Sequence, residues 1–279
     1  MANKVVVSTY KRLEEYVKLF ASKKADLVIL ESRSGLGKSS TVDKLTADKE
    51  KIVFTVQVTP LSNYIHLYNN REKEPLICYR DIDYLLKSAL QASLFKQLCE
   101  TKPIKTIRYF STSKLLEDIP HEFELKASVL IECNQWNTAN ENIKAIADRG
   151  FRVIFEPSQE EILNKMKEIS EQPYADLSLE QRTEVFDFIK DNSKGHALTL
   201  RDSIRGEQLY SYSLLSKKYN EPFDWQKELG ALLQVPEEHG VLLKLLASKL
   251  SVGEQAKEFA KITGKSTRNY WRLKRELMK

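Results

Sequence analysis

One stretch near the N-terminus constrains the fold of this 279-residue chain more than any other. Residues 27–30 (LVIL) are consecutive apolar residues, which is typical of a short strand buried in a parallel sheet. Gly35 and Gly37 follow almost at once, although the chain has only nine glycines. Beyond them, Val42 and Leu45 have the spacing of one helical face. The sequence therefore predicts a strand, a glycine-rich loop and a helix in direct succession.

Residues 32–39 (SRSGLGKS) have the pattern of a phosphate-binding loop, G-x-x-x-x-G-K-[ST], except that Ser32 replaces the first glycine. Glycines allow backbone N–H groups to converge on phosphate oxygens, and the following helix N-terminus adds partial positive charge. Lys38 would reach the terminal phosphates of ATP, and the Ser39 hydroxyl would bind Mg²⁺. The residues expected to hold the nucleotide are Ser34, Gly35, Leu36, Gly37, Lys38, Ser39 and Ser40. The alternative is an ordinary glycine-rich turn that ends in a surface lysine.

The composition is that of a globular protein without a zinc site. A length of 279 residues suits one large domain or two to three small ones, and a hydrophobic content of 42% is enough to form their cores. Neither the three cysteines nor the four histidines have metal-ligand spacing, and such cysteines are typical of buried thiols in a cytosolic protein. No apolar run has the length of a membrane span, and the N-terminus lacks the apolar segment of a signal peptide. We therefore expect a cytoplasmic protein that does not engage membranes.

Apolar runs and helical spacing alternate along the first 157 residues, as in an α/β protein. The expected strands span residues 27–30, 51–58, 75–83, 127–134 and 153–155. The expected helices among them span residues 5–22, 41–45, 61–68 and 84–99. A hairpin is expected within residues 102–126. From residue 159 onward only helices are expected, at 159–171, 179–192, 197–213, 225–233 and 238–250, with two short ones after them.

Polar residues stand at the ends of two predicted strands. Residues 75–83 form an apolar strand that ends at Asp81 and Asp83, and a nucleotide enzyme places its magnesium and water-orienting carboxylates at such a strand end. Asp81 is the candidate for both tasks, whereas Asp83 is expected to cap the helix that starts near residue 84. Asn134 ends the strand 127–134. Ligands bind at the carboxyl edge of such sheets, so Asn134 would lie on the same side as Asp81.

This order of features resembles the AAA+ ATPases, and within them a group found in phages and other mobile elements. The resemblance covers roughly residues 8–215 and is carried by residues 32–39, 76–83, 86–101, 129–136 and 147–157. It implies an α/β fold: a three-layer P-loop NTPase core with a parallel sheet, a helical lid and a small all-α C-terminal domain. The implied boundaries are 1–157 for the core, 158–218 for the lid and 219–279 for the C-terminal domain.

The resemblance also implies roles for individual residues. The hairpin, at residues 104–126, lies where some members carry a substrate-contacting hairpin, so its Lys105, Arg108 and Lys114 would form either a contact with nucleic acid or a solvated basic face. Residues 32–39 correspond to the Walker A loop, and Asp81 corresponds to the Walker B acid. Asn134 would be the polar sensor that helps to place the attacking water. Arg149 would be the arginine finger, inserted into the site of a neighbouring subunit, and Arg201 the second sensor, which touches the phosphates. ATP and Mg²⁺ are the implied cofactors, and a ring or filament, such as a hexamer, is the implied assembly.

The chain departs from this family at Arg80. Family members commonly end the Walker B strand in two acids, and here Arg80 takes the place of the first. Three alternatives follow: Asp81 covers both tasks, hydrolysis is slow, or the protein uses ATP mainly as a switch. If hydrolysis is slow for lack of an acid, the substitution Arg80→Asp would raise turnover.

The C-terminal segment carries the net positive charge. Residues 251–279 hold eight basic and three acidic side chains, a surplus of five that equals the net charge of +5 of the whole chain. Residues 255–264 and 265–277 have the pattern of a helix-turn-helix, with Gly264 at the turn. The residues expected to contact DNA are Lys265, Thr267, Arg268, Asn269 and Arg272. The alternative is a basic helix that caps the lid or binds a partner protein.

Two classes of function fit these features. The first is an ATP-driven machine that acts on DNA as an oligomer, in replication initiation or helicase loading, with a helicase or another replication protein as partner. The second is a weakly hydrolysing, ATP-gated DNA-binding regulator, for which Arg80 is the motivation. A transposition target-selection ATPase has the same core and would differ by its partner.

Overall fold

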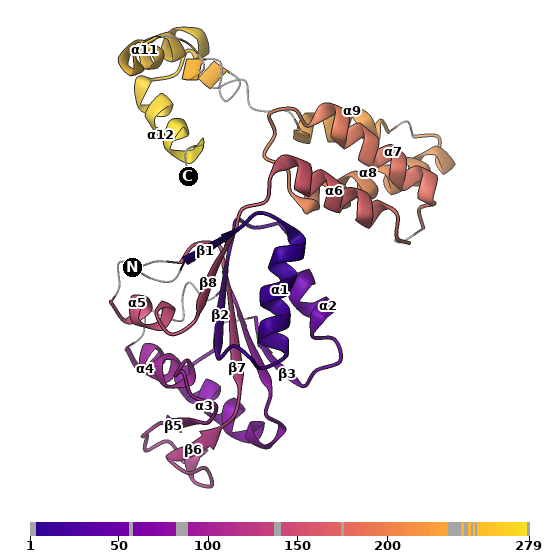
Figure 1. The fold of residues 1–279 in the computed structure, drawn as a ribbon. Helices are drawn as coiled ribbons and strands as arrows, with labels where there is room; N and C mark the ends of the chain where they lie inside the picture. The colour runs from indigo at the N-terminus through magenta and orange to yellow at the C-terminus, as the bar shows by residue number, and fades with distance from the viewer. Residues whose placement is uncertain are drawn as a thin grey trace. The chain divides into compact units, whose positions relative to one another are not determined.

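The structure is a computed structural model that describes residues 4–55, 58–81, 89–136, 141–173, 176–221, 223–233, 241–242, 245–246, 248 and 250–277. The chain forms two compact units, Met1–Lys165 and Met166–Lys279 (Figure 1). The first contains a sheet with helices on both faces, whereas the elements of the second are helices in the part of the chain that the structure describes.

A six-stranded parallel sheet forms the middle layer of the first unit, with the strand order β1-β8-β2-β7-β4-β3. The strands are β1 (Lys4–Val7), β2 (Leu27–Glu31), β3 (Lys51–Phe54), β4 (Leu76–Arg80), β7 (Ser128–Cys133) and β8 (Phe151–Phe155). Nearly all residues of the central strands β2, β4 and β7 are buried, because helices cover both faces of the sheet. The three-layer α/β architecture predicted from the sequence is confirmed.

In the described part of this unit, helices form the outer layers (Figure 1). On one face lie α1 (Tyr10–Ala21) and α2 (Lys38–Leu45), and on the other lie α3 (Pro60–Asn69), α4 (Ala89–Leu98) and α5 (Glu141–Ala147). Alternate strand residues such as Ile29, Tyr79 and Ile131 belong to the core beneath α3, α4 and α5. Side chains in a strand alternate between the two faces, so Arg80 and Glu132 point toward α2 instead.

The N-terminal strand β1 corrects one expectation. A single helix was predicted over residues 5–22, but the structure has β1 at Lys4–Val7 and α1 from Tyr10. The β-branched residues 5–7 favour a strand, and β1 pairs in parallel with β8 at the edge of the sheet. Thr9 then begins the helix, since its side chain accepts a hydrogen bond from the Arg12 backbone N–H.

The predicted hairpin is present and consists of β5 (Lys105–Arg108) and β6 (Glu122–Leu125), which pair antiparallel. Its basic residues do not form one exposed face. Lys105 is fully buried and its ammonium group donates to Asp26 Oδ1 at 3.2 Å and to the Ala127 carbonyl at 2.7 Å. Arg108 is exposed but forms an ion pair with Glu122. Neither predicted role of Lys105, nucleic-acid contact or solvated basic face, is therefore correct.

Several other predicted elements lie partly outside the residues that the structure describes. Strand β3 ends at Phe54, earlier than the predicted 51–58, and residues 56–57 lie outside the described part. The predicted cap Asp83 and the start of its helix near residue 84 also lie outside it, as does most of the predicted helix 238–250. The remaining strands and helices lie close to their predicted positions.

The second unit contains two groups of packed helices. The helices α7 (Leu179–Asn192), α8 (Leu200–Lys218) and α9 (Trp225–Leu233) pack together, and α6 (Gln159–Ser170) crosses the boundary between the units. Gly206 of α8 allows close packing, because a Cβ atom there would lie 2.5 Å from Val185 Cγ1. The helices α11 (Val252–Thr263) and α12 (Thr267–Leu277) form the second group.

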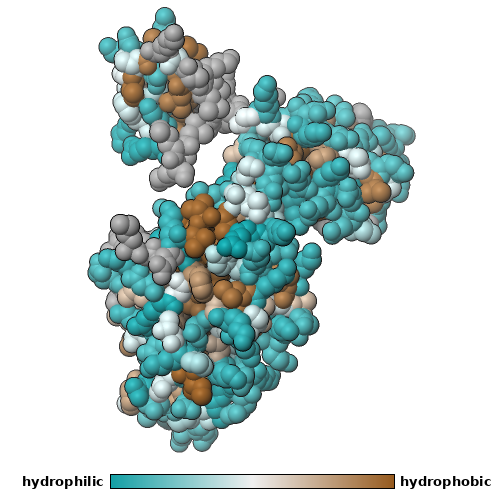
Figure 2. Space-filling view, in the orientation of Figure 1, coloured by the Kyte–Doolittle hydropathy of each residue, from teal (hydrophilic) through white to brown (hydrophobic). Residues whose placement is uncertain are grey.

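Hydrophilic residues cover most of the face shown in Figure 2, and hydrophobic residues appear there in small patches. This distribution matches the burial of the apolar strand and helix residues. Within the described ranges, no helix combines the length and the apolar character that a membrane crossing requires.

Candidate functional site

The loop between β2 and α2 has the backbone that its glycines predict. Gly35 and Gly37 have φ angles of 81° and 79°, in the left-handed region that favours glycine. Ser32 has no such left-handed backbone, and its N–H donates to the Cys133 carbonyl of β7 at 3.2 Å. A serine therefore replaces the first glycine of the pattern without backbone strain.

Lys38, the first residue of α2, lies over this loop. The side chain is buried, and its Nζ donates to the Ser32 carbonyl at 2.6 Å, to Ser32 Oγ at 2.9 Å and to the Arg33 carbonyl at 3.3 Å. Lys38 is therefore not the surface lysine that the alternative interpretation required. The N-terminus of a helix leaves backbone N–H groups without intrahelical partners, and together with a lysine they form a site for an anion.

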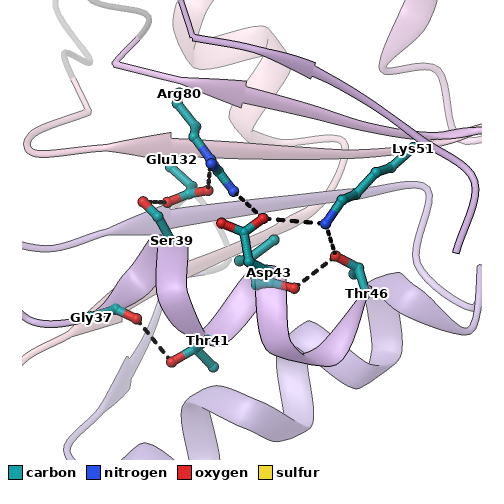
Figure 3. Close-up of polar contacts among 9 residues, drawn as sticks. Gly37, Ser39, Thr41, Asp43, Thr46, Lys51, Arg80 and Glu132 are labelled. Carbon is teal, nitrogen blue, oxygen red and sulfur yellow. Dashed lines mark hydrogen bonds and ion pairs between the residues drawn. The ribbon is translucent and has the colours of Figure 1, made fainter. Parts of the chain in front are cut away.

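Beside the loop, two strands and α2 bring together a network of charged and polar side chains (Figure 3). Arg80 ends β4 and lies directly opposite Glu132 of β7 in the sheet register. Its Nε donates to Glu132 Oε1 at 2.9 Å, and its Nη2 donates to Asp43 Oδ1 at 2.8 Å. Ser39 Oγ donates to the other Glu132 oxygen, Oε2, at 2.5 Å. Ser39, which is predicted to bind Mg²⁺, thus contacts the carboxylate of Glu132, a residue that is only 3% exposed.

The partners of Arg80 keep its network charged. Burial would lower the pKa of Arg80, but the hydrogen bond to Asp43 and the charge of Glu132 raise it above its usual range. Burial would likewise raise the pKa of Asp43, but hydrogen bonds from Arg80 and Lys51 lower it. Arg80 and Asp43 are therefore an ionised pair at neutral pH.

The predicted catalytic residues Asp81 and Asn134 follow these two neighbouring strands. Because Arg80 pairs with Glu132, Asp81 and Asn134 both lie just beyond the carboxyl edge of the sheet, and both are exposed. Asp81 has a φ angle of 52°, unusual for a residue with a side chain, and its N–H donates to the Glu132 carbonyl at 3.1 Å. Both residues lie at the predicted edge of the sheet. Their catalytic roles stay predictions.

The two predicted arginines lie in different units. Arg149 follows α5 and is half-buried, and its guanidinium donates to the Lys96 carbonyl of α4 in its own chain. Arg201 lies exposed in the first turn of α8, in the second unit. Their predicted contacts with a nucleotide stay predictions.

The C-terminal helices α11 and α12 have the predicted local arrangement. Gly264, with a φ angle of 68°, ends α11, and Phe259 packs against the buried Tyr270 of α12. Of the predicted DNA contacts, Asn269 is partly buried and the others are exposed, namely Lys265, Thr267, Arg268 and Arg272. Trp271 of α12 is 45% exposed.

Sequence reasoning missed Glu132 and Asp43 as members of the site. A signal for Glu132 was present, because it is the one charged residue in the strand sequence SVLIEC. A charge inside an otherwise buried strand needs a partner, and here the partner is Arg80. Asp43 lies one helical turn beyond Ser39, so both face the sheet from α2.

Neither a protein-family model nor a curated protein matches the sequence. Among solved structures, a mutant of RuvB from Thermotoga maritima matches with a TM-score of 0.50 and 13% identity, over 93% of this chain and 83% of that chain. A second mutant of the same protein matches with a TM-score of 0.50 and 12% identity, over 92% and 82%. PCH-2 of C. elegans matches with a TM-score of 0.44 and 14% identity, over 80% of this chain and 67% of that chain. The parallel sheet, its loop and the helical region that follows define the fold of an AAA+ P-loop NTPase.

Proposed function

We propose that this chain binds ATP with Mg²⁺ at residues 32–39 and hydrolyses it. The observation that supports this most directly is the position of Lys38, whose ammonium group lies over the glycine loop at the N-terminus of α2. The three oxygens that it contacts hold it where phosphate oxygens would replace them. The position of this loop in an AAA+ fold supports a nucleotide as the ligand of the anion site.

The groups around the loop fit a magnesium ion. Mg²⁺ prefers oxygen ligands, and the Ser39 hydroxyl and the Glu132 carboxylate are adjacent at 2.5 Å. Among the described residues, no three His, Cys, Asp or Glu side chains cluster as a metal site, so nucleotide phosphates would complete the coordination. Bound there, Mg²⁺ would supply neutralisation of the charge that develops on the phosphates.

For hydrolysis, we propose that Asp81 and Asn134 orient the attacking water at the carboxyl edge of the sheet. Arg149 of a neighbouring subunit and Arg201 of the lid would stabilise the phosphate charge, which requires a ring or filament of subunits. The proposed division is a core of residues 1–157, a lid of residues 158–218 and a C-terminal domain of residues 219–279.

We further propose that the C-terminal domain binds DNA. Its exposed basic residues around the start of α12 support this, and the surplus of positive charge in residues 251–279 provides attraction to phosphates. Replication initiation or helicase loading in a phage or mobile element is the proposed setting. A slowly hydrolysing DNA-bound regulator is the second candidate, since Arg80 places a positive charge beside the proposed magnesium site.

Replacing Lys38 by alanine should weaken ATP binding about 10- to 100-fold, because it removes charge-assisted hydrogen bonds to the phosphates. Binding of a fluorescent ATP analogue to the full-length protein measures this. The control is Lys44→Ala in the last turn of α2, which removes the same charge at a position away from the loop and should leave affinity unchanged. Equal affinities for wild type and Lys38→Ala would discard the proposed site.

Replacing Arg268 or Arg272 by alanine should weaken binding to double-stranded DNA and reduce the salt dependence, with the slope of log K against log salt falling by about 1 per lost phosphate contact. Fluorescence anisotropy of labelled duplex at several salt concentrations measures it. Lys257→Ala removes an exposed charge from α11 and serves as the matched control. If all three variants lose the same affinity, α12 has no special role and the basic charge acts only through long-range attraction.

A further inference from the structure

We propose that Glu132 of β7 supplies the carboxylate of the magnesium site, in place of the acid that Arg80 displaces from β4. The proposal rests on the proposed binding of ATP with Mg²⁺. It assigns the carboxylate that binds the metal to β7, the strand next to β4. The sequence had instead suggested Asp81, which follows β4.

The first observation is the contact between Glu132 and Ser39. The Ser39 hydroxyl donates a hydrogen bond to Glu132 Oε2, with 2.5 Å between the two oxygens. The lone pairs of that hydroxyl therefore point elsewhere and are available to a cation. In P-loop NTPases the loop Ser or Thr and a strand carboxylate hold the ion together. Here Glu132 is the carboxylate in contact with that serine.

The second observation is the sheet register. Arg80 and Glu132 are directly opposite residues on neighbouring strands, and both side chains face α2. An acid and a base therefore lie side by side in this row of the sheet. An acid on β7 reaches the Ser39 hydroxyl, while the base on β4 reaches Asp43 as well.

The third observation explains how the positive charge of Arg80 is tolerated. Arg80 is 17% exposed and donates to two carboxylates, those of Glu132 and Asp43, at 2.9 and 2.8 Å. Lys51 also pairs with Asp43, at 3.2 Å, so two cations, Arg80 and Lys51, face two anions and the positive charge of Arg80 is balanced. Arg80 occupies Glu132 Oε1 and leaves Oε2, the oxygen nearest to the loop serine, for Ser39 and the hydrated ion.

Asp81 is placed differently. Strand β4 ends at Arg80, so Asp81 lies beyond the strand and outside the row of residues that faces α2. The left-handed backbone of Asp81 turns the chain at this point, and the side chain is exposed. Asp81 is available to orient water, whereas Glu132 is the buried carboxylate beside the loop.

The test separates nucleotide binding from metal binding. ATP affinity of the full-length protein is measured with excess Mg²⁺ and with EDTA, and binding of Mn²⁺ in the presence of ADP is measured by electron paramagnetic resonance. Glu132→Gln should bind ATP in EDTA as wild type does, but should lose about 10- to 100-fold in Mn²⁺ affinity and lose the gain that Mg²⁺ gives. Asp81→Asn should keep the Mn²⁺ affinity of the wild type and the gain in ATP affinity that Mg²⁺ gives.

Folding of the variants is checked by circular dichroism, and the double variant Arg80→Gln with Glu132→Gln removes both charges of the pair together. It should show the same loss of metal affinity as Glu132→Gln. Normal Mn²⁺ affinity in either variant, or a loss confined to Asp81→Asn, would overturn the assignment of Glu132. Wild-type protein that binds no ATP in either buffer would instead contradict the proposed function.

Discussion

Replacing Arg149 by alanine should reduce ATP hydrolysis about 10³-fold while ATP affinity stays within about twofold of wild type, since an arginine finger acts on the transition state. The wild-type rate per subunit should rise with protein concentration, because the finger comes from a neighbour. In the structure, Arg149 donates to the Lys96 carbonyl of its own chain. Assembly would have to exchange that carbonyl for phosphate oxygens, so the isolated subunit should hydrolyse ATP slowly even with its arginine intact.

Mixing two inactive variants tests whether Arg149 acts between subunits. A Lys38→Ala subunit lacks a nucleotide site but carries Arg149, and an Arg149→Ala subunit has the reverse defect. In a randomly mixed ring about a quarter of the sites combine an intact loop with an intact neighbouring arginine, so an equal mixture should recover about a quarter of the wild-type rate. A mixture as inactive as its parents would place Arg149 in a structural role, through its contact with α4.

Local patterns predict most of the sheet, but they fail where one element follows another closely. The apolar strands β2, β4 and β7 were each predictable because a buried parallel strand needs little besides its own sequence. At the N-terminus, three valines precede the helical spacing by only two residues, and the two signals merge into one long helix. Thr9 separates them, because a capping residue marks where a helix begins.

The site shows a different limit of sequence reasoning. Lys38 and Ser39 were predictable because the loop is continuous in sequence. The pairing of Arg80 with Glu132 joins residues 52 positions apart, and it depends on the register between two strands, which the sequence does not display. Arg80 on its own therefore indicated a deficit of negative charge, whereas the structure shows a base that is matched by acids on β7 and α2.

The helical unit contains a buried ion pair whose disruption should have a large effect on stability. Arg182 of α7 and Glu207 of α8 are 1% and 2% exposed, and two guanidinium nitrogens donate to Glu207 Oε1 at 2.9 and 2.7 Å. Replacing Glu207 by alanine would leave a guanidinium buried without its carboxylate, which costs about 3–5 kcal/mol. Urea unfolding followed by circular dichroism measures the loss, and hydrogen exchange over α7 and α8 shows whether it falls on this unit.

The double variant Arg182→Met with Glu207→Leu is the matched control. It removes both charges and fills the space with apolar side chains, so it should recover most of the lost stability, because the desolvation of a buried pair offsets much of its attraction. If the double variant is as unstable as Glu207→Ala, the pair stabilises the unit by more than it costs to bury. If Glu207→Ala loses less than about 1 kcal/mol, water reaches Arg182 and the helices α7 and α8 separate more readily than their packing implies.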